Sequence, residues 1–480
     1  MAHCTKCGRQ FLALPFGKKV CAWCVRHEAA QRGEEPENPK QPVMPVPWAH
    51  RNASPVIVTQ ALFGTNVAVF VGMALAGISI TDPTSQDLIR WGADWGPRTL
   101  SGEWWRLLTS TFLHIGIVHI AFNMWCLWDL GSLCESLYGH WTFAAVYLIS
   151  GVAASLTSVA WHPEGVSAGA SGAIFGLAGS LIASFYLGEF SLPRIAVTAT
   201  LRSVVAFAGY NLILGGISRH TDNSAHIGGL VTGLVLGALV AGVAPHHDQP
   251  TRRLAVLVPV LVAVVGGAAW LNHSRSYIVH TERGNAFLWE NKPDQAVAEL
   301  QAALQQRPDY LPAHFGLAHA YSNRKQFEKA EAELKRVIEL KPDDEFAYYD
   351  LGFVYLDDKR ILQAKETFAR ILAFSQKSSA AHFGLGMALA AEENYRAAVE
   401  EYQTAIKLGP EREGAYYNLG LSLFKLKMYD DAIAAYLREQ ENNGDEYDIE
   451  MALAGAYQAR GLRQQAQEAT EKAAKLKTGD

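Results

Sequence analysis

The chain has 480 residues and a formal net charge of −5. This length is too great for one ordinary domain and suggests two to four. The mean hydropathy of the whole chain is near zero because an apolar first half is averaged with a polar second half. The composition therefore excludes a chain that is soluble throughout. We expect a lipid bilayer as one partner and no nucleic-acid partner.

Seven stretches of the first half are almost free of Lys, Arg, Asp and Glu. A helix needs about 20 apolar residues to cross the hydrocarbon core of a bilayer. The first stretch begins far from the N-terminus and is too long for a signal-peptide core, so we interpret it as a retained anchor. We predict seven membrane spans, near residues 55–80, 112–133, 141–161, 168–187, 197–217, 225–243 and 254–271.

The distribution of Lys and Arg predicts the orientation of these spans. With the N-terminus inside, the inner segments hold twelve Lys and Arg and the outer loops hold four, which fits the excess of positive charge on the cytoplasmic side. Seven spans then place everything after residue 272 outside. We expect an integral multi-pass protein of a bacterial cell membrane, with a cytoplasmic N-terminus.

Residues 1–28 hold two cysteine pairs, Cys4 with Cys7 and Cys21 with Cys24, separated by thirteen residues. Two such pairs suit a tetrahedral structural Zn²⁺. So short a segment cannot bury an adequate core, which favours metal-stabilised folding over a redox or unliganded tail. We predict a small zinc-ribbon-like module, followed by a flexible linker over residues 29–54, which are rich in Pro, Glu and Gln.

Residues 272–480 are polar and repeat with a period of 34. Each unit carries a small residue, a large apolar residue three positions later, and an alanine after nine more. The pattern resembles the tetratricopeptide repeat and predicts an α-solenoid of six units. We expect this solenoid to bind a protein or peptide. A helical array without a ligand is the alternative. The repeating alanines are Ala296, Ala330, Ala364, Ala398, Ala432 and Ala466.

A serine flanked by glycines opens the fourth span. Ser171 lies in Gly169-Ala170-Ser171-Gly172, at the head of an apolar stretch. A serine hydroxyl is a weak nucleophile until a base removes its proton. A helix N-terminus also offers backbone N–H groups to a developing oxyanion. Small residues equally serve helix packing in membranes, so this motif alone favours packing over catalysis.

A histidine opens the sixth span. His226 is followed by Gly229, Gly233 and Gly237, which line one helix face and predict very close packing against a neighbouring helix. If that neighbour is the fourth span, Ser171 and His226 meet near the outer side of the membrane. Polar and ionisable groups at membrane depth are candidates for a functional site. The pair therefore suggests hydrolysis inside the membrane.

The second span supplies two further polar side chains. His119 and Asn123 are four residues apart, so they share a helix face. Both can donate hydrogen bonds and could stabilise the negative oxygen of a tetrahedral intermediate. His114 lies closer to the outer surface and is interpreted as ordering the preceding loop.

With these residues placed, residues 55–243 resemble the six-helix core of a rhomboid-family intramembrane serine protease. The match also includes Trp105-Arg106 in the first outer loop and Gly131 with Glu135 and Gly139. Residues 244–271, a loop and a seventh span, together with the outer repeats at 272–480, resemble family members with a six-plus-one layout.

The resemblance implies a Ser171–His226 dyad without a third acidic residue and without a cofactor for catalysis. It implies an oxyanion site formed by His119, Asn123 and the Ser171 backbone N–H, with Gly169 supporting it. Phe175 matches the position where the family often stacks an aromatic ring on the catalytic histidine, in the role that an aspartate has in soluble triads. The implied substrates are transmembrane proteins, which the repeats would recruit directly or through an adaptor.

The predicted fold is all-α: a polytopic membrane helix bundle and an α-solenoid, with a small zinc ribbon. One alternative is a catalytically silent membrane scaffold of the same fold that assembles partners through the repeats. The presence of both Ser171 and His226 argues against it. An intramembrane metalloprotease or a transporter is disfavoured because no His-Glu-x-x-His occurs and carboxylates are few in the membrane stretches.

Overall fold

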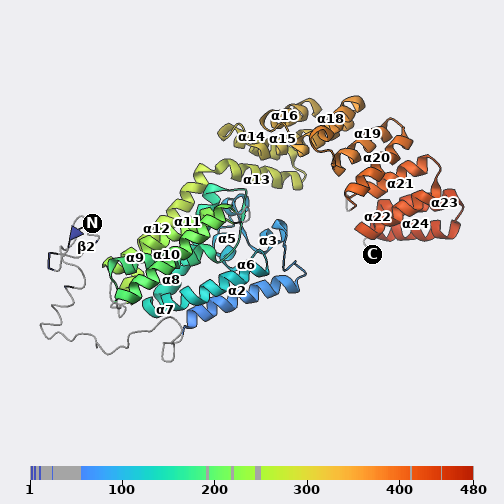
Figure 1. Ribbon diagram of the computed structural model, residues 1–480. Coiled ribbons are helices and arrows are strands. Elements are labelled where there is room, and N and C mark those ends of the chain that lie inside the picture. Colours follow the sequence, from blue (N-terminus) through green and yellow to red (C-terminus); the bar gives the residue numbers. More distant parts are fainter. Residues whose placement is uncertain are drawn as a thin grey trace. The chain divides into compact units, whose positions relative to one another are not determined.

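The computed structural model is mostly helical and divides into two units, Met1–Val279 and His280–Asp480 (Figure 1). Of the four cysteines of the predicted zinc module, only Cys24 is described, so that site lies outside the described residues. The structure describes residues 56–190, 194–217, 221–243, 250–410, 413–444 and 446–478, and within the first 28 residues the strands β1 (Ala2–His3) and β2 (Gln10–Phe11), residues 5–6 and Cys24.

The helices of the first unit follow the predicted spans in order. A short two-stranded antiparallel sheet, β3 (Asp94–Trp95) with β4 (Val166–Ser167), joins the loop between the first two predicted spans to the segment before the fourth. The helices are α2 (Ile57–Leu75), α3 (Ser85–Trp91), α4 (Gly96–Leu100), α5 (Arg106–Thr109), η1 (Ser110–Phe112), α6 (Ile117–Cys126), η2 (Leu127–Gly131), α7 (Ser132–Tyr138), α8 (His140–Trp161), α9 (Ser171–Leu187), α10 (Arg194–Ile217), α11 (Asn223–Val243) and α12 (Pro250–Ser274).

Five helices among the described residues are long and apolar enough to cross a membrane: Ile57–Leu75, Ile117–Tyr138, His140–Trp161, Asn223–Gly242 and Pro250–Ser274. The fourth and fifth predicted spans are present as shorter apolar helices, Ser171–Leu187 and Val197–Ile213. The presence of several apolar helices is therefore confirmed, and the number of seven spans stays a prediction.

The second span begins and ends later than predicted. Gly116 has a φ of +129°, a left-handed conformation that suits glycine, and the helix begins at Ile117. At the other end the helix passes through Glu135, whose carboxylate is buried. It accepts hydrogen bonds from the backbone N–H of Val58 and of Thr59 and from the Thr59 hydroxyl. These donors at the start of α2 satisfy the charge, so an acidic residue does not end the span here.

The close approach of α9 and α11 rests on the predicted glycine face. A Cβ built on Gly229 or on Gly233 would lie 1.9 Å from the carbonyl oxygen of Gly172 or Gly176, respectively. The neighbour of the sixth span is therefore the fourth. Because no side chain intervenes, the two helix backbones are in direct contact, as small residues permit between membrane helices.

The seventh apolar helix is fastened to the bundle at both ends. Near its start, Arg253 donates to the Glu189 carboxylate at 2.5 Å and to the Tyr138 carbonyl at 3.3 Å, and both charged side chains are buried. Past its end, Arg275 donates to the carbonyl of Ala160 at the end of α8 at 2.8 Å. A buried pair of opposite charges resists separation, because removal of one partner leaves the other charge uncompensated.

The described part of the second unit consists of helical hairpins, as the 34-residue period predicts. The small residue of each unit admits a large side chain of the second helix: a Cβ on Gly352 would lie 2.4 Å from the Phe368 ring, and one on Gly386 2.6 Å from the Tyr402 ring. The helices are α13 (Ser276–Trp289), α14 (Pro293–Gln306), α15 (Leu311–Asn323), α16 (Phe327–Leu340), α17 (Glu345–Asp357), α18 (Ile361–Phe374), α19 (Ser379–Ala391), α20 (Tyr395–Leu408), α21 (Ala415–Lys425), α22 (Tyr429–Asn443), α23 (Tyr447–Arg460) and α24 (Arg463–Thr478).

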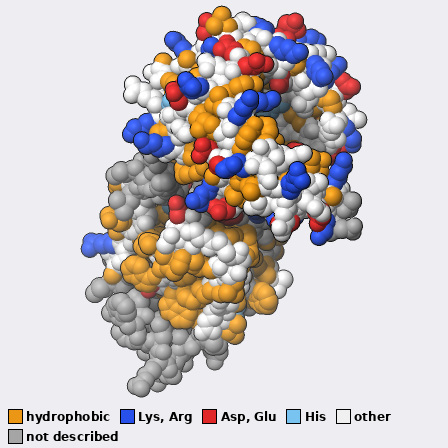
Figure 2. All heavy atoms as spheres, turned by 90° about the vertical axis from the view of Figure 1, so that its right-hand side faces the viewer, with side chains coloured by type: hydrophobic (Ala, Val, Ile, Leu, Met, Phe, Trp, Pro, Cys, Tyr) orange, Lys and Arg blue, Asp and Glu red, His pale blue; other side chains and the backbone are white. Residues whose placement is uncertain are grey.

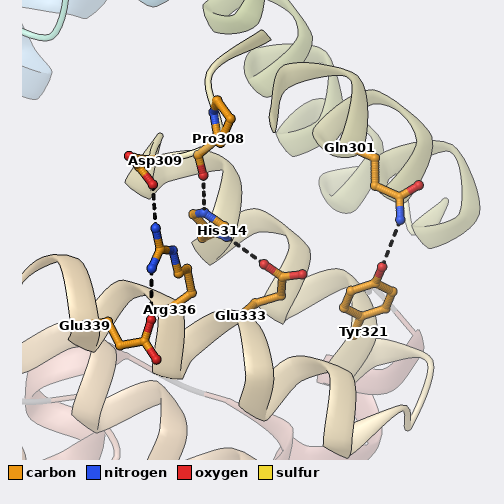
Figure 3. Close-up of polar contacts among 8 residues, drawn as sticks. All are labelled: Gln301, Pro308, Asp309, His314, Tyr321, Glu333, Arg336 and Glu339. Carbon is orange, nitrogen blue, oxygen red and sulfur yellow. Dashed lines mark hydrogen bonds and ion pairs between the residues drawn. The ribbon is translucent and has the colours of Figure 1, made fainter. Parts of the chain in front are cut away.

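A histidine–glutamate pair recurs within these hairpins. His314 on α15 meets Glu333 on α16 at 2.6 Å, and its other ring nitrogen lies 2.8 Å from the Pro308 carbonyl oxygen (Figure 3). Equivalent pairs join His280 to Glu299 at 2.6 Å and His382 to Glu401 at 2.7 Å. Each pair ties the first helix of a hairpin to the second. Burial would lower the pKa of His314, but its bonds to Glu333 and to the Pro308 carbonyl outweigh burial and raise it.

The two units also differ in surface chemistry. Figure 2 shows hydrophobic side chains spread over the visible face of the helical bundle, whereas on the repeats Lys, Arg, Asp and Glu are interspersed among hydrophobic and uncharged side chains. The bundle exposes large apolar side chains that include Leu75, Val118, Trp141 and Trp161, each at least 70% exposed. Exposed apolar surface of this kind suits a helix bundle solvated by lipid.

Candidate active site

Ser171 is presented by a short segment that is held from two sides. Strand β4 leads into Gly169, which has a φ of +145° and whose N–H donates to the Ser110 carbonyl at 2.9 Å. Ser171 is the first residue of α9. The first N–H groups of a helix have no intrahelical acceptor, so the Ser171 N–H is available to a negative oxygen. Ser171 itself is half-buried, whereas the rest of α9 up to Leu181 is buried.

The structure brings His226 to Ser171. The distance from Ser171 Oγ to His226 Nε2 is 2.9 Å. His226 lies in the first turn of α11 and is buried, with 7% of the residue exposed. Because α9 and α11 pack backbone to backbone through the glycine face, their first turns lie side by side. A histidine nitrogen at this distance can accept the serine proton.

Phe175, one turn after Ser171, stacks on the histidine. Its ring centroid is 4.3 Å from that of His226, with an angle of 12° between the planes. Among the described residues, His226 Nδ1 has no hydrogen-bond partner. No described carboxylate therefore hydrogen-bonds to the imidazole Nδ1 in the manner of a soluble triad, and the Phe175 ring lies nearly parallel to the imidazole.

His119 and Asn123 reach the same region from α6. A Cβ built on Gly169 would lie 3.1 Å from His119 Nε2 and 3.7 Å from Ser171 Oγ, so both groups border the space over this glycine. His119 Nδ1 accepts from the Ile115 N–H at 3.3 Å, which leaves Nε2 facing Gly169. Asn123 is buried and its amide donates to the His119 carbonyl at 3.0 Å. This contact uses one of the two amide hydrogens of Asn123.

His114 is fully buried in the loop before α6, and its ring meets the His119 ring edge-on at 5.2 Å between centroids. The role of His114 in ordering the loop stays a prediction.

Two acidic residues that the sequence interpretation left aside lie near the dyad. Asp94 in β3 is buried and accepts from the Thr99 hydroxyl at 2.6 Å. Burial, together with the negative charge of Asp222, raises the pKa of Asp94 to about 7. Asp222 precedes α11. Burial would raise its pKa too, but hydrogen bonds from Ser158, Ser224 and Ser167 outweigh burial and lower it. Asp222 is therefore an ionised acceptor at neutral pH.

These features define a membrane-type helix bundle with a serine–histidine pair at the ends of two closely packed helices. Residues 101–243 match the rhomboid domain, and residues 278–438 match the tetratricopeptide repeat protein 21 C-terminal ARM domain. The chain is 33% identical over 227 residues to the rhomboid protease GluP of Bacillus subtilis, covering 47% of this chain and 43% of that protein.

It is 30% identical over 225 residues to the rhomboid protease AarA of Providencia stuartii, covering 42% of this chain and 78% of AarA. The chain belongs to the rhomboid family, and its second unit is a tetratricopeptide-like repeat domain. It spans about half the length of the first curated relatives, from 43% of GluP to 56% of RHOMBOID-like protein 7 of Arabidopsis thaliana.

Solved structures that resemble the chain include MamA, at 25% identity and a TM-score of 0.31 over 34% of this chain and 95% of that one. The type IV pilus biogenesis factor PilW matches at 19% identity and a TM-score of 0.37, over 41% of this chain and 90% of that one.

Proposed function

We propose that the protein is a serine endopeptidase that cleaves transmembrane segments of other membrane proteins. The observation that carries this proposal is the 2.9 Å contact between Ser171 Oγ and His226 Nε2, at the N-terminal ends of two apolar helices. The family membership and the names of GluP and AarA as rhomboid proteases support it.

In the proposed reaction, Ser171 Oγ attacks the scissile carbonyl carbon while His226 Nε2 takes the hydroxyl proton. The negative oxygen of the tetrahedral intermediate receives hydrogen bonds from the Ser171 N–H, His119 Nε2 and the second amide hydrogen of Asn123. His226 then gives its proton to the leaving amine, which breaks the peptide bond and leaves an acyl-enzyme. A water molecule, deprotonated by His226, hydrolyses the ester and restores Ser171.

Phe175 and Gly169 are assigned supporting roles in this reaction. The stacked Phe175 ring holds the imidazole in the plane that points Nε2 at the serine. Gly169 has no side chain, and this leaves room for a substrate carbonyl: a Cβ at this position would lie only 2.8 Å from the His119 ring. No cofactor takes part in this chemistry.

The proposed membrane arrangement has seven spans, with the N-terminus in the cytoplasm and the repeats outside. Residues 55–243 form the protease core, and residues 244–271 provide a loop and the seventh span. Residues 272–480 form the repeat domain. Residues 1–28 bind a structural Zn²⁺ through Cys4, Cys7, Cys21 and Cys24, and residues 29–54 link this module to the core.

We further propose that the repeats bind substrates or an adaptor and raise the local concentration of substrate at the membrane. Removal of residues 272–480 is expected to spare cleavage of a generic single-span substrate and to impair cleavage of a physiological one. Equal rates on both substrates, with and without the repeats, would show that the repeats do not recruit substrate.

Labelling with a serine-directed phosphonate tests the site directly. Full-length protein in liposomes should be labelled on Ser171, as mapped by peptide mass spectrometry, and His226→Ala should lose the label because no base activates the hydroxyl. Ser180→Ala is the matched control, since Ser180 lies on the same helix and donates to the Leu177 carbonyl. A wild-type protein that takes up no phosphonate would favour the silent scaffold.

A further inference from the structure

The carboxylate of Asp222 joins the two segments that carry Ser171 and His226. Ser167 Oγ donates to Asp222 Oδ2 at 2.7 Å. Ser167 lies four residues before Ser171, and Asp222 lies four residues before His226. The Ser167–Asp222 contact therefore joins the same two segments as the Ser171–His226 contact, four residues earlier in each.

On the histidine side, Asp222 caps the helix. Its Oδ1 accepts from the Ala225 N–H at 3.1 Å and from the Ser224 hydroxyl at 2.5 Å, and its carbonyl accepts from the His226 N–H at 3.3 Å. A cap of this kind fixes the first turn of a helix by satisfying N–H groups that have no intrahelical acceptor. Because His226 projects from that first turn, the cap sets the position of its ring.

On the serine side, Ser167 is the last residue of β4, and its position determines where the Gly169–Ser171 turn begins. The register of β4 against β3 pairs Ser167 with Asp94. The chain turns at Gly169, where φ is +145°. The Ser167–Asp222 bond and the Gly169–Ser110 backbone bond both hold residues of this turn.

The Ser167–Asp222 contact is partly buried and charge-assisted. Ser167 and Ser224 are buried, and Ser158 on α8 is a further hydrogen-bond donor to the same carboxylate. A hydrogen bond to an ionised acceptor away from water is stronger than one between neutral groups. Asp222 does not hydrogen-bond to the imidazole Nδ1 as the aspartate of a soluble triad does, since His226 Nδ1 has no hydrogen-bond partner among the described residues.

We propose that Asp222 is a positioning residue that holds the serine turn and the histidine helix in register through its bond to Ser167. The inference rests on the proposed function, because it assigns a role in setting the Ser171–His226 distance. Its loss should lower the rate of the chemical step and leave substrate binding unchanged, since the atoms nearest to a Cβ built on Gly169 belong to His119 and Ser171.

Ser167 and Ser224 both donate a hydrogen bond to the Asp222 carboxylate, so their alanine variants give a matched test. Ser167→Ala removes the link between the two segments, whereas Ser224→Ala removes a hydroxyl of the same kind that stays within the α11 end. With full-length protein in liposomes and a single-span substrate, Ser167→Ala should lower kcat roughly 10- to 100-fold with little change in KM. Ser224→Ala should stay within about twofold of wild type, since it leaves the register of the two segments intact.

A second pair of variants guards against a simple folding defect. Asp222→Asn keeps the oxygen that caps Ala225 and offers an amide to Ser167, whereas Asp222→Ala removes both contacts. Asp222→Asn should therefore retain clearly more activity than Asp222→Ala. Ser167→Ala and Ser224→Ala should have equal thermal stability in detergent.

The outcomes separate the two proposals. Equal kcat for Ser167→Ala and Ser224→Ala, beside an active wild type, would overturn the positioning role alone. So would equal activity of Asp222→Asn and Asp222→Ala. A wild type that neither cleaves nor takes up phosphonate would overturn the proposed function, and the positioning role with it.

Discussion

Replacement of Gly233 by alanine tests whether the direct contact of α9 with α11 sets the geometry of the serine–histidine pair. A Cβ at this position would lie 1.9 Å from the Gly176 carbonyl oxygen and 2.6 Å from its carbonyl carbon. Ordinary contacts of a Cβ begin near 3.4 Å. The obstacle is backbone, so no side-chain rotation relieves it, and the helices must separate by about 1.5 Å.

This separation carries a cost in stability and in rate. Forced overpacking of a tight interface destabilises by about 1–3 kcal/mol. Gly233 lies about two turns after His226 on the same helix face, so the separation is transmitted to the 2.9 Å contact with Ser171. A misplacement of about 1 Å between reacting groups lowers the rate by about 100-fold. We therefore expect Gly233→Ala to lose both thermal stability and most of its kcat.

Gly242→Ala is the control on the same helix, because a Cβ there meets nothing within 4 Å. Alanine favours a helix over glycine by up to about 1 kcal/mol, so this variant should match or exceed wild-type stability and keep its activity. The assays are unfolding in detergent and cleavage of a single-span substrate in liposomes. If Gly233→Ala equals Gly242→Ala in both assays, the close-packing argument is wrong.

Three further predictions concern other contacts. Phe175→Leu keeps an apolar side chain but loses the stack on the histidine, so kcat should fall about two- to tenfold; Phe185→Leu on the same helix should not lower it. Arg253→Met removes the guanidinium that compensates the buried Glu189 charge, which should cost about 3–5 kcal/mol in detergent unfolding, and Glu189→Leu added to it should restore most of the loss. The raised pKa of His314 means that its stabilising charge is fully present below the unfolded-state pKa, near 6.5, and is lost as pH rises through the folded-state value. Hydrogen exchange of α15 in the full chain should therefore show His314→Gln less protected than wild type at pH 6, with the difference shrinking by pH 8.

Each of these has a result that would contradict it. Wild-type kcat in Phe175→Leu would mean that the ring does not orient the imidazole. An unfolding midpoint of Arg253→Met equal to wild type would show that the buried pair does not fasten α12. A difference in exchange that grows from pH 6 to pH 8 would reverse the sign expected for the histidine.

The parts of this fold that sequence reasoning found are those with a strong local signal. Glycines at intervals of four on an apolar helix predict a backbone contact, and the structure shows that contact between α9 and α11. The same packing explains why Ser171 and His226, 55 positions apart, could be expected to meet. The 34-residue period of small and large residues likewise predicts the hairpins of the second unit.

Sequence reasoning missed features that depend on the hydrogen-bond partners and backbone angles that residues acquire only in the folded chain. The predicted second span ends near residue 133, yet hydrogen bonds from α2 to the Glu135 carboxylate allow the helix to continue to Tyr138. The sequence neighbours of Asp222 give no indication that Ser167 would reach it. The second span begins only after Gly116, whose φ is positive. A single glycine in a sequence does not indicate that conformation.

Cleavage of a single-span substrate by purified full-length protein in liposomes tests the central claim most directly, with wild type beside Ser171→Ala and His226→Ala. We expect cleavage by wild type and none by either variant, with all three proteins folded to the same extent. Normal turnover by Ser171→Ala would contradict the assignment of the nucleophile and, with it, the proposed mechanism.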